Sequence, residues 1–277
     1  MKAKIFSAYH LQALKPKSSN IVPSQVGGLE FDLNMPHSDA VGHNISHKNN
    51  LYSELTLQYQ VWQNELSKLD YVGICHYRRL FNPHGPSIVT GGKYEQFEYG
   101  KRSRPQVAFN QDTWDAVTSD KTVAAMVALL SPGHKMVTLQ PFQKTNQWSL
   151  WTLAGLNWVP VRTVIEFFEY CQKTMTYDEF TVFNKEINQS HDHFCNNMIF
   201  CDTDTFAKYS SWLFDLLFGF EQHLLEVEKS TGLTLIVPRM FGYFSEYMLR
   251  PWTVLHGIRP KFVDSICFTD LKLDTRI

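Results

Sequence analysis

The sequence lacks several features that would assign a protein to a functional class at once. Its formal net charge is only -1 over 277 residues, which gives no electrostatic reason to expect nucleic acid as a partner. It has no apolar run long enough to span a bilayer, and residues 1–7 lack the long apolar region of a signal peptide. We therefore expect a soluble, cytoplasmic protein that can still touch the inner face of a membrane.

Cysteine is scarce, and no two cysteines form a CxxC pair. The chain has five cysteines, an odd number that favours reduced thiols in the cytoplasm over a disulfide framework. Internal repeats and low-complexity segments are absent as well. Hydrophobic residues make up 44% of the chain and aromatic residues 14%, which is enough for a sizeable core. The length fits one large α/β domain or two small ones, and we predict one.

The most informative stretch is 69–81, which opens as a short apolar strand and ends in His76, Tyr77, Arg78 and Arg79. Strands of open α/β sheets present ligands at their carboxyl ends, and arginine binds phosphate through two parallel hydrogen bonds. The stretch therefore predicts a site for a phosphate-bearing ligand. The alternative is a surface arginine pair that closes a strand. If the strand continued, only one of the two arginines would face the site.

A polar aromatic pair ends the first predicted strand, over residues 4–10. Tyr9 and His10 are placed to stack on a base, although half-buried packing is an equal alternative. Both residues are donor-binding candidates.

A loop of small polar residues and cations, 39–50, leads into a helix predicted over 52–64 from its apolar spacing. Asn49 or Asn50 can cap this helix, whose amino end offers free amides to a phosphate or a sugar hydroxyl. Capping alone is the simpler use of Asn49. Lys48 beside it favours a ligand contact for both residues.

The chain is predicted to be a single domain, 1–277, with two halves. Residues 1–81 form a nucleotide-binding βαβ half, and residues 119–277 form an acceptor-side half. The basic segment 82–118 is rich in glycine and proline. It is interpreted as a lid or an acceptor-side loop, or else as a tolerated insertion.

Three tryptophans, Trp148, Trp151 and Trp158, cluster in the sequence of the second half. Such a cluster can stack on sugars, but at these apolar positions core packing is the favoured interpretation.

A second polar patch, around Asp192, offers a general base. His191 and His193 flank it, but histidines two residues apart on a loop match no standard zinc arrangement. The DXD-like sequence 202–204 lies where a strand passes into a helix, so a helix cap explains it.

A third patch places Arg239 and Glu246 inside an otherwise apolar, aromatic segment, 237–247. Buried charges need partners, so the two side chains either pair with each other or face a ligand. If the segment is helical, their separation of seven residues puts them on one face.

These patches together resemble one family, the capsular and exopolysaccharide glycosyltransferases first catalogued as a domain of unknown function. The match extends from the first strand to about Trp252, and its most specific element is the HYRR sequence. The blocks that carry it are 42–49 with 54–56, 71–79 with Phe81, and Asn197-Met198 with Arg239, Gly242-Tyr243 and Ser245-Glu246.

The resemblance implies a GT-A-like fold, an α/β/α sandwich that binds a nucleotide sugar on a mainly parallel central sheet. It implies a UDP-sugar donor, and some members are linked to galactofuranose transfer, which is inverting. Asn197 is similar to the asparagine that faces the sugar in glycogenin-type transferases. The family has an acidic residue where this chain has His43, which puts a donor contact there in doubt. In GT-A enzymes the strand after the second helix ends in DXD, which holds a divalent metal; this chain has His76, Tyr77, Arg78 and Arg79 at that place, and we hypothesise that the cations among them do the work of the metal.

The sequence is therefore interpreted as a hexosyltransferase. It would move galactofuranose or galactose from a UDP-sugar to a glycan or lipid-linked glycan of a bacterial surface polysaccharide, without a required cofactor or metal. Asp192 or Glu246 would be the base. The alternatives are a metal-dependent hydrolase and a non-catalytic nucleotide- or glycan-binding module. The predicted donor-binding residues are Tyr9, His10, Lys48, Asn49, His76, Arg78, Arg79, Asn197 and Arg239.

Overall fold

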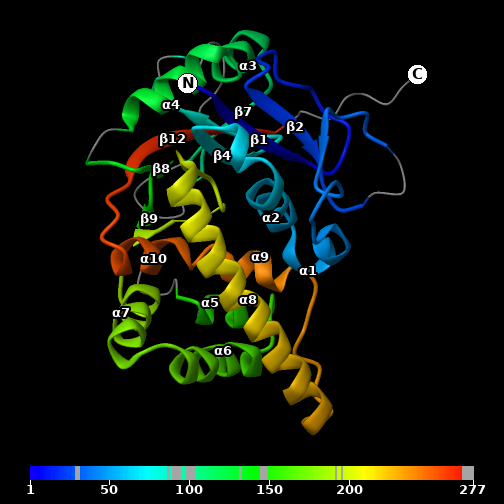
Figure 1. Ribbon diagram of the computed structural model, residues 1–277, viewed down its shortest axis with the longest axis vertical. Coiled ribbons are helices and arrows are strands. Elements are labelled where there is room, and N and C mark those ends of the chain that lie inside the picture. The colour runs from blue at the N-terminus through cyan, green and yellow to red at the C-terminus, as the bar shows by residue number, and fades with distance from the viewer. Residues whose placement is uncertain are drawn as a thin grey trace.

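The structure, a computed structural model, describes residues 1–28, 32–85, 88, 95–97, 104–130, 133–143, 149–190, 192–194 and 196–269. It is a mixed α/β fold in which a central sheet has helices on both faces (Figure 1). The strands of the sheet are β1 (Ala3–Tyr9), β2 (Ile21–Gln25), β3 (His37–Ser38), β4 (Tyr71–His76), β5 (Arg79–Asn82), β6 (Glu95–Phe97), β7 (Arg104–Val107), β8 (Met136–Leu139), β11 (Ile199–Asp202) and β12 (Lys261–Phe268). A separate pair consists of β9 (Phe142–Gln143) and β10 (Asp192–His193).

The strand order is β3-β2-β1-β4-β11-β8-β12-β7-β6, with β5 paired to both β4 and β12. Of the ten pairings in the described part of this sheet, five are parallel and five are antiparallel. The sheet is thus mixed, and the prediction of a mainly parallel sheet is not confirmed. A two-residue turn joins β4 to β5, and such a short connection can only give an antiparallel pair. The strand β11 is antiparallel to both of its neighbours, β4 and β8.

Two helical layers cover the sheet (Figure 1). One is small and contains α3 (Gln111–Val117) and α4 (Asp120–Leu129). The other is large and is crossed by the long helix α8 (Thr203–Thr231). It also contains α1 (Asn49–Tyr52), α2 (Leu55–Asn64), α5 (Trp151–Gly155), α6 (Val161–Thr174), α7 (Tyr177–Asn188), α9 (Met240–Ser245) and α10 (Leu249–Leu255), and short 3-10 turns at Ser46–Lys48 and Leu66–Lys68.

Alternate strand residues serve the two layers, as the pleat of a strand requires. In β4, Val72 and Ile74 belong to the apolar cluster beneath the large layer, whereas Cys75 belongs to the cluster beneath α3 and α4. Gly73 lies between them and packs against β11, where an added Cβ would come 2.8 Å from the Phe200 ring. Packing on both faces and against β11 therefore holds β4 in place, and with it the residues that follow its carboxyl end.

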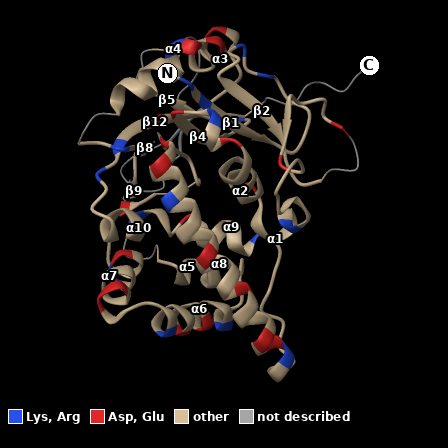
Figure 2. Ribbon diagram, in the orientation of Figure 1, with Lys and Arg blue, Asp and Glu red and all other residues tan. Residues whose placement is uncertain are grey.

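Along the ribbons of the outer helices, the positions of basic and acidic residues are interspersed in Figure 2, in keeping with a net charge near zero. Among the described residues, no helix has the length and apolar character that crossing a membrane requires.

The helix predicted over 52–64 is two helices, because the backbone breaks at Ser53, which has a φ of 50°. Neither Asn49 nor Asn50 caps them. Asn49 is the first residue of α1, and its Nδ2 donates to the Ser53 carbonyl at 2.8 Å and to Thr56 Oγ1 at 3.0 Å. The capping prediction is therefore wrong: the Asn49 amide holds the break together instead.

The segment 82–118 lies only partly within the described residues, since 86–87, 89–94 and 98–103 fall outside them. The described part is not uniformly irregular, because it contains the hairpin of β6 and β7 and the helix α3.

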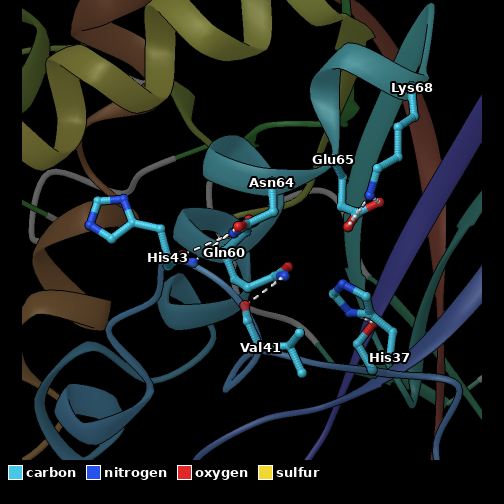
Figure 3. A network of polar contacts seen from close by, with 8 residues as sticks. His37, Val41, His43, Gln60, Asn64, Glu65 and Lys68 are labelled. Carbon is cyan, nitrogen blue, oxygen red and sulfur yellow. Dashed lines mark hydrogen bonds and ion pairs between the residues drawn. The ribbon is translucent and has the colours of Figure 1, made fainter.

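The loop that precedes α1 is fastened to α2 (Figure 3). The His43 amide donates to Asn64 Oδ1 at 3.0 Å, and Asn64 Nδ2 donates back to the His43 carbonyl at 2.9 Å. Gln60 Nε2 donates to the Val41 carbonyl at 3.1 Å. Gly42 has a φ of 69°, and an added Cβ would lie 2.2 Å from Asn64 Oδ1, so the turn requires glycine.

Candidate active site

The carboxyl ends of β1 and β4 lie side by side, because the two strands are parallel and Ala8 is opposite His76. The antiparallel strand β11 begins at the same edge, so Asn196 and Asn197, which precede it, also arrive there. A pocket of about 470 Å³ opens at this edge. That volume lies in the usual range for small-molecule sites.

The basic wall of the pocket is the turn between β4 and β5. Tyr77 and Arg78 form this turn, and Arg79 begins β5 paired with His76. Because the chain reverses here instead of continuing as a strand, both arginines line the pocket. Arg78 is exposed and Arg79 is half-buried, with its Nη1 donating to Asn196 Oδ1 at 3.3 Å.

The Asn196 carbonyl holds the imidazole of His76. His76 Nε2 is 2.8 Å from this oxygen and must be the donor, since a carbonyl only accepts. Asn196 and Asn197 have φ angles of 73° and 49°, a left-handed conformation that asparagine tolerates better than most residues. This tight bend brings two amide side chains next to the turn after β4.

The opposite wall comes from the segment around α9. Arg239, with a φ of 65°, precedes the helix, and its backbone N–H donates to the Asn50 carbonyl at 2.7 Å. Arg239 and Glu246 both line the pocket, although only Met240–Ser245 between them form the helix α9. Three guanidiniums from two distant segments of the chain thus surround one hollow.

Glu54 is a pocket residue that the sequence interpretation did not select. Its Oε1 accepts from Asn197 Nδ2 at 2.8 Å, and Ser245 Oγ donates to Asn197 Oδ1 at 3.0 Å. Asn197 is buried and does not line the pocket, so it positions Glu54 and α9 from behind. A signal was present, because Glu54 lies within one of the blocks that carry the family resemblance.

His10 lines the same pocket, and the edge of its ring meets Tyr77, with the ring centroids 5.1 Å apart. Loss of hydration lowers the pKa of His10, and the positive charges of Arg78 and Arg239 lower it further, against the opposing effect of Glu54. The imidazole is therefore neutral near pH 7 and can exchange hydrogen bonds with a ligand.

Asn49 also lines the pocket, and a buried carboxylate fixes the loop that carries it. Asp39 accepts from the Gly27 amide at 3.1 Å, from Ser46 Oγ at 2.7 Å and from the hydroxyl of Thr56. An added Cβ on Gly27 would come 2.7 Å from Asn49 Oδ1. The chain near Asn49 therefore has little freedom to move.

Besides Asn197, three predicted site residues lie outside the pocket lining. Tyr9 is buried, and its hydroxyl donates to the Leu14 carbonyl at 2.8 Å. Lys48 forms an ion pair with Glu221, at 2.6 Å between Nζ and Oε2. Asp192 belongs to β10, where one carboxylate oxygen is 3.9 Å from Arg250 Nη1.

The described part of the chain contains no group of three or more His, Cys, Asp and Glu side chains that could hold a metal ion. His191 lies outside the described residues, and His193 packs on the Tyr247 ring at 4.4 Å between centroids. In the DXD-like sequence, Asp202 caps α8 through the Thr205 amide at 2.7 Å, and Asp204 pairs with a lysine one turn along. The sequence predicted a helix cap here at Thr203 or Asp204, whereas the cap in the structure is Asp202.

A larger hollow, of about 850 Å³, lies near the amino end of β1, against α4. Lys2, Lys4 and Lys68 line it together with Glu65 and Asp120. It contains none of the predicted site residues, so the smaller pocket remains the candidate site.

Known proteins resemble most of the chain. A family model described as "Domain of unknown function (DUF4422)" matches residues 4–256. A search of curated proteins finds no match. Among solved structures, the chain is similar to the apo structure of WbbM, a bifunctional glycosyltransferase, with a TM-score of 0.76 and 20% identity. The match covers 100% of this chain and 47% of that chain, so this chain spans about half of its length. At this identity the likeness shows a shared fold.

Proposed function

The chain belongs to the DUF4422 family, and we propose that it is a glycosyltransferase that takes a hexosyl group from a nucleoside diphosphate sugar. One observation carries the proposal: Arg78, Arg79 and Arg239 line one pocket that also contains the carboxylates of Glu54 and Glu246. Guanidiniums suit a diphosphate, and a carboxylate suits the removal of a proton from a sugar hydroxyl. The fold shared with a solved glycosyltransferase supports the same proposal.

In the proposed reaction, an acceptor hydroxyl oxygen attacks the anomeric carbon of the donor sugar. The bond from that carbon to the diphosphate oxygen breaks, and the diphosphate keeps the electron pair. Glu246 takes the proton of the hydroxyl, and the three guanidiniums stabilise the negative charge that develops on the leaving group. A single displacement of this kind inverts the anomeric configuration.

The proposed donor is UDP-galactofuranose or UDP-galactose, and the proposed acceptor is a glycan or lipid-linked glycan of a surface polysaccharide, reached at the inner face of the membrane. Because fixed cations surround the pocket, we propose that turnover needs no divalent metal. Activity that survives EDTA would support this part of the proposal. Activity that returns only with manganese would contradict it.

Of the two carboxylates that the sequence offers as a base, Asp192 and Glu246, we propose Glu246. Glu246 lines the pocket, whereas Asp192 lies outside its lining. Glu246→Gln is expected to lower kcat by about 10²- to 10⁴-fold while UDP still binds. Asp192→Asn is the matched control and is expected to keep kcat. If Asp192→Asn abolishes turnover and Glu246→Gln does not, the assignment of the base is wrong.

A thermal-shift screen tests the function itself, because a ligand that binds the native state raises its apparent stability. UDP and UDP-hexoses are expected to raise Tm, and at least one UDP-hexose is expected to be turned over to UDP. Binding of UDP without turnover of any donor would favour a non-catalytic nucleotide-binding module instead.

A further inference from the structure

An exposed tryptophan lies beside the proposed donor site. Trp158 is 46% exposed, and its ring stacks on Tyr243, with the centroids 5.0 Å apart and an interplanar angle of 30°. One face of the indole is thus occupied by Tyr243. An aromatic ring that is half exposed and held on one side leaves surface for a flat, partly apolar ligand.

Tyr243 connects this ring to the pocket. The Arg239 guanidinium carbon lies 5.3 Å from the centroid of the Tyr243 ring. Tyr243 belongs to α9, and Glu246 follows it by three residues at the end of that helix, so the two lie on one face. Arg239 and Glu246 line the donor pocket. The Tyr243 ring therefore contacts both Trp158 and Arg239, a cation of the donor pocket.

The exposure of Trp158 is built into the backbone. Its N–H donates to the Leu153 carbonyl at 2.9 Å, and the Asn157 N–H donates to the Ala154 carbonyl at 3.0 Å. Asn157 has a φ of 57°, a conformation that asparagine adopts in tight turns. The side chains of Leu156 and Val161 on either side are 46% and 57% exposed. This turn therefore presents an apolar surface at a fixed place.

We propose that Trp158, stacked on Tyr243, is a binding subsite for a sugar residue of the acceptor glycan. The C–H face of a hexose ring would pack on the open surface of the indole, and the hydroxyl of the next residue would reach Glu246. This inference rests on the proposed function, because it needs a donor site at Arg239. The sequence interpretation favoured core packing for this tryptophan, but the structure exposes it.

The contact of Tyr243 with Arg239, which lines the donor pocket, favours a glycan over a membrane or a protein as the occupant. A second exposed tryptophan makes the contrast. Trp151 is 44% exposed and stacks on Phe168 of α6, with the centroids 5.7 Å apart, but these two residues line a separate hollow of about 320 Å³ that shares no lining residue with the donor pocket. Trp151 is thus a control for Trp158: it is also a tryptophan and is nearly as exposed, but it lies at a hollow separate from the donor pocket.

The test uses the full chain labelled with 5-fluorotryptophan. The fluorine resonances of Trp158 and Trp151 are assigned with the variants Trp158→Phe and Trp151→Phe. Galactobiose, maltotriose and chitotriose are the probes, titrated to millimolar concentrations. We expect at least one probe to shift the Trp158 resonance and to leave the Trp151 resonance in place.

Affinity for that probe then separates the two tryptophans. Trp158→Ala is expected to weaken binding of the probe about tenfold, or 1.4 kcal/mol, and Trp158→Phe is expected to keep most of the affinity. Trp151→Ala is expected to leave the affinity unchanged. The inference is overturned if no probe shifts Trp158, or if both alanine variants weaken binding equally. It is also overturned if phosphatidylglycerol vesicles shift Trp158 and the oligosaccharides do not.

A parallel measurement keeps this inference separate from the proposed function. The rise in Tm with UDP is expected to be the same in wild type, Trp158→Ala and Trp151→Ala, since Trp158 does not line the donor pocket. Failure of UDP to stabilise the wild type would refute the donor site. Normal stabilisation by UDP with no response at Trp158 would refute only the acceptor subsite.

Discussion

Replacement of Lys48 separates a structural role from a binding role. Lys48 Nζ lies 2.6 Å from Glu221 Oε2, and the Tyr52 hydroxyl donates to the same oxygen at 2.8 Å. The Glu221 side chain is only 8% exposed and that of Lys48 is 27% exposed. Lys48→Met therefore leaves a nearly buried carboxylate with one of its two partners missing.

The magnitude follows from that geometry. Breaking a fully buried ion pair costs about 3–5 kcal/mol, and an exposed pair contributes about 0–1 kcal/mol. Because Lys48 keeps some contact with water and Tyr52 still donates, we expect Lys48→Met to lower the free energy of unfolding by about 2 kcal/mol. For a chain of this size that corresponds to a fall in Tm of about 4–8 °C.

The assay is denaturant unfolding of Lys48→Met, Glu221→Gln and the double variant, together with UDP titration of each. The double variant is expected to recover most of the loss, since it leaves no unpaired charge. UDP affinity is expected to stay within about twofold of wild type, because Lys48 does not line the pocket. A large loss of UDP affinity at unchanged stability would refute this placement and restore Lys48 as a donor ligand.

Three further predictions concern the groups around the pocket. Asn197→Ala removes the hydrogen bond to Glu54, so it is expected to cost about 1–3 kcal/mol of stability and to lower kcat, as unfolding and initial-rate measurements would show. The pKa of His10 is lowered below its usual value of about 6.5, so its imidazole is uncharged in the free protein at neutral pH. Because an anionic ligand favours the charged imidazole, UDP affinity is expected to rise as the pH falls below about 6.5. In calorimetry, His10→Gln is expected to flatten this pH dependence. If His10→Gln leaves the profile unchanged, His10 does not face the diphosphate. Gly42→Ala forces a Cβ against Asn64 at positive φ and is expected to lower the free energy of unfolding by at least about 1 kcal/mol; a neutral result would contradict the tight turn.

Local patterns in the sequence identify the elements that carry the pocket. The apolar run before His76 predicts β4, and Arg239 and Glu246, the charges of the apolar segment 237–247, both line the pocket. These signals are short-range: a buried strand needs apolar residues, and a charge within an apolar segment needs a partner or a ligand.

The rest depends on contacts between distant segments. Nothing in the local pattern around Lys48 shows that it meets Glu221, 173 residues away. The break at Ser53 depends on backbone geometry next to α9, where an added Cβ on Gly242 would lie 3.1 Å from Ser53 Oγ. The turn at Tyr77 and Arg78 decides that both arginines face the pocket, and the sequence alone left a continued strand open.

Titration of UDP into arginine variants tests the central claim most directly. Each charge-assisted hydrogen bond is worth about 1.5–3 kcal/mol, so the triple variant Arg78→Ala, Arg79→Ala, Arg239→Ala is expected to bind UDP at least about 10³-fold more weakly than wild type. Arg259→Ala, which changes an exposed arginine outside the pocket lining, is the control and is expected to bind UDP normally. If a folded triple variant binds UDP as tightly as wild type, the three guanidiniums do not hold a diphosphate and the proposed donor site is wrong.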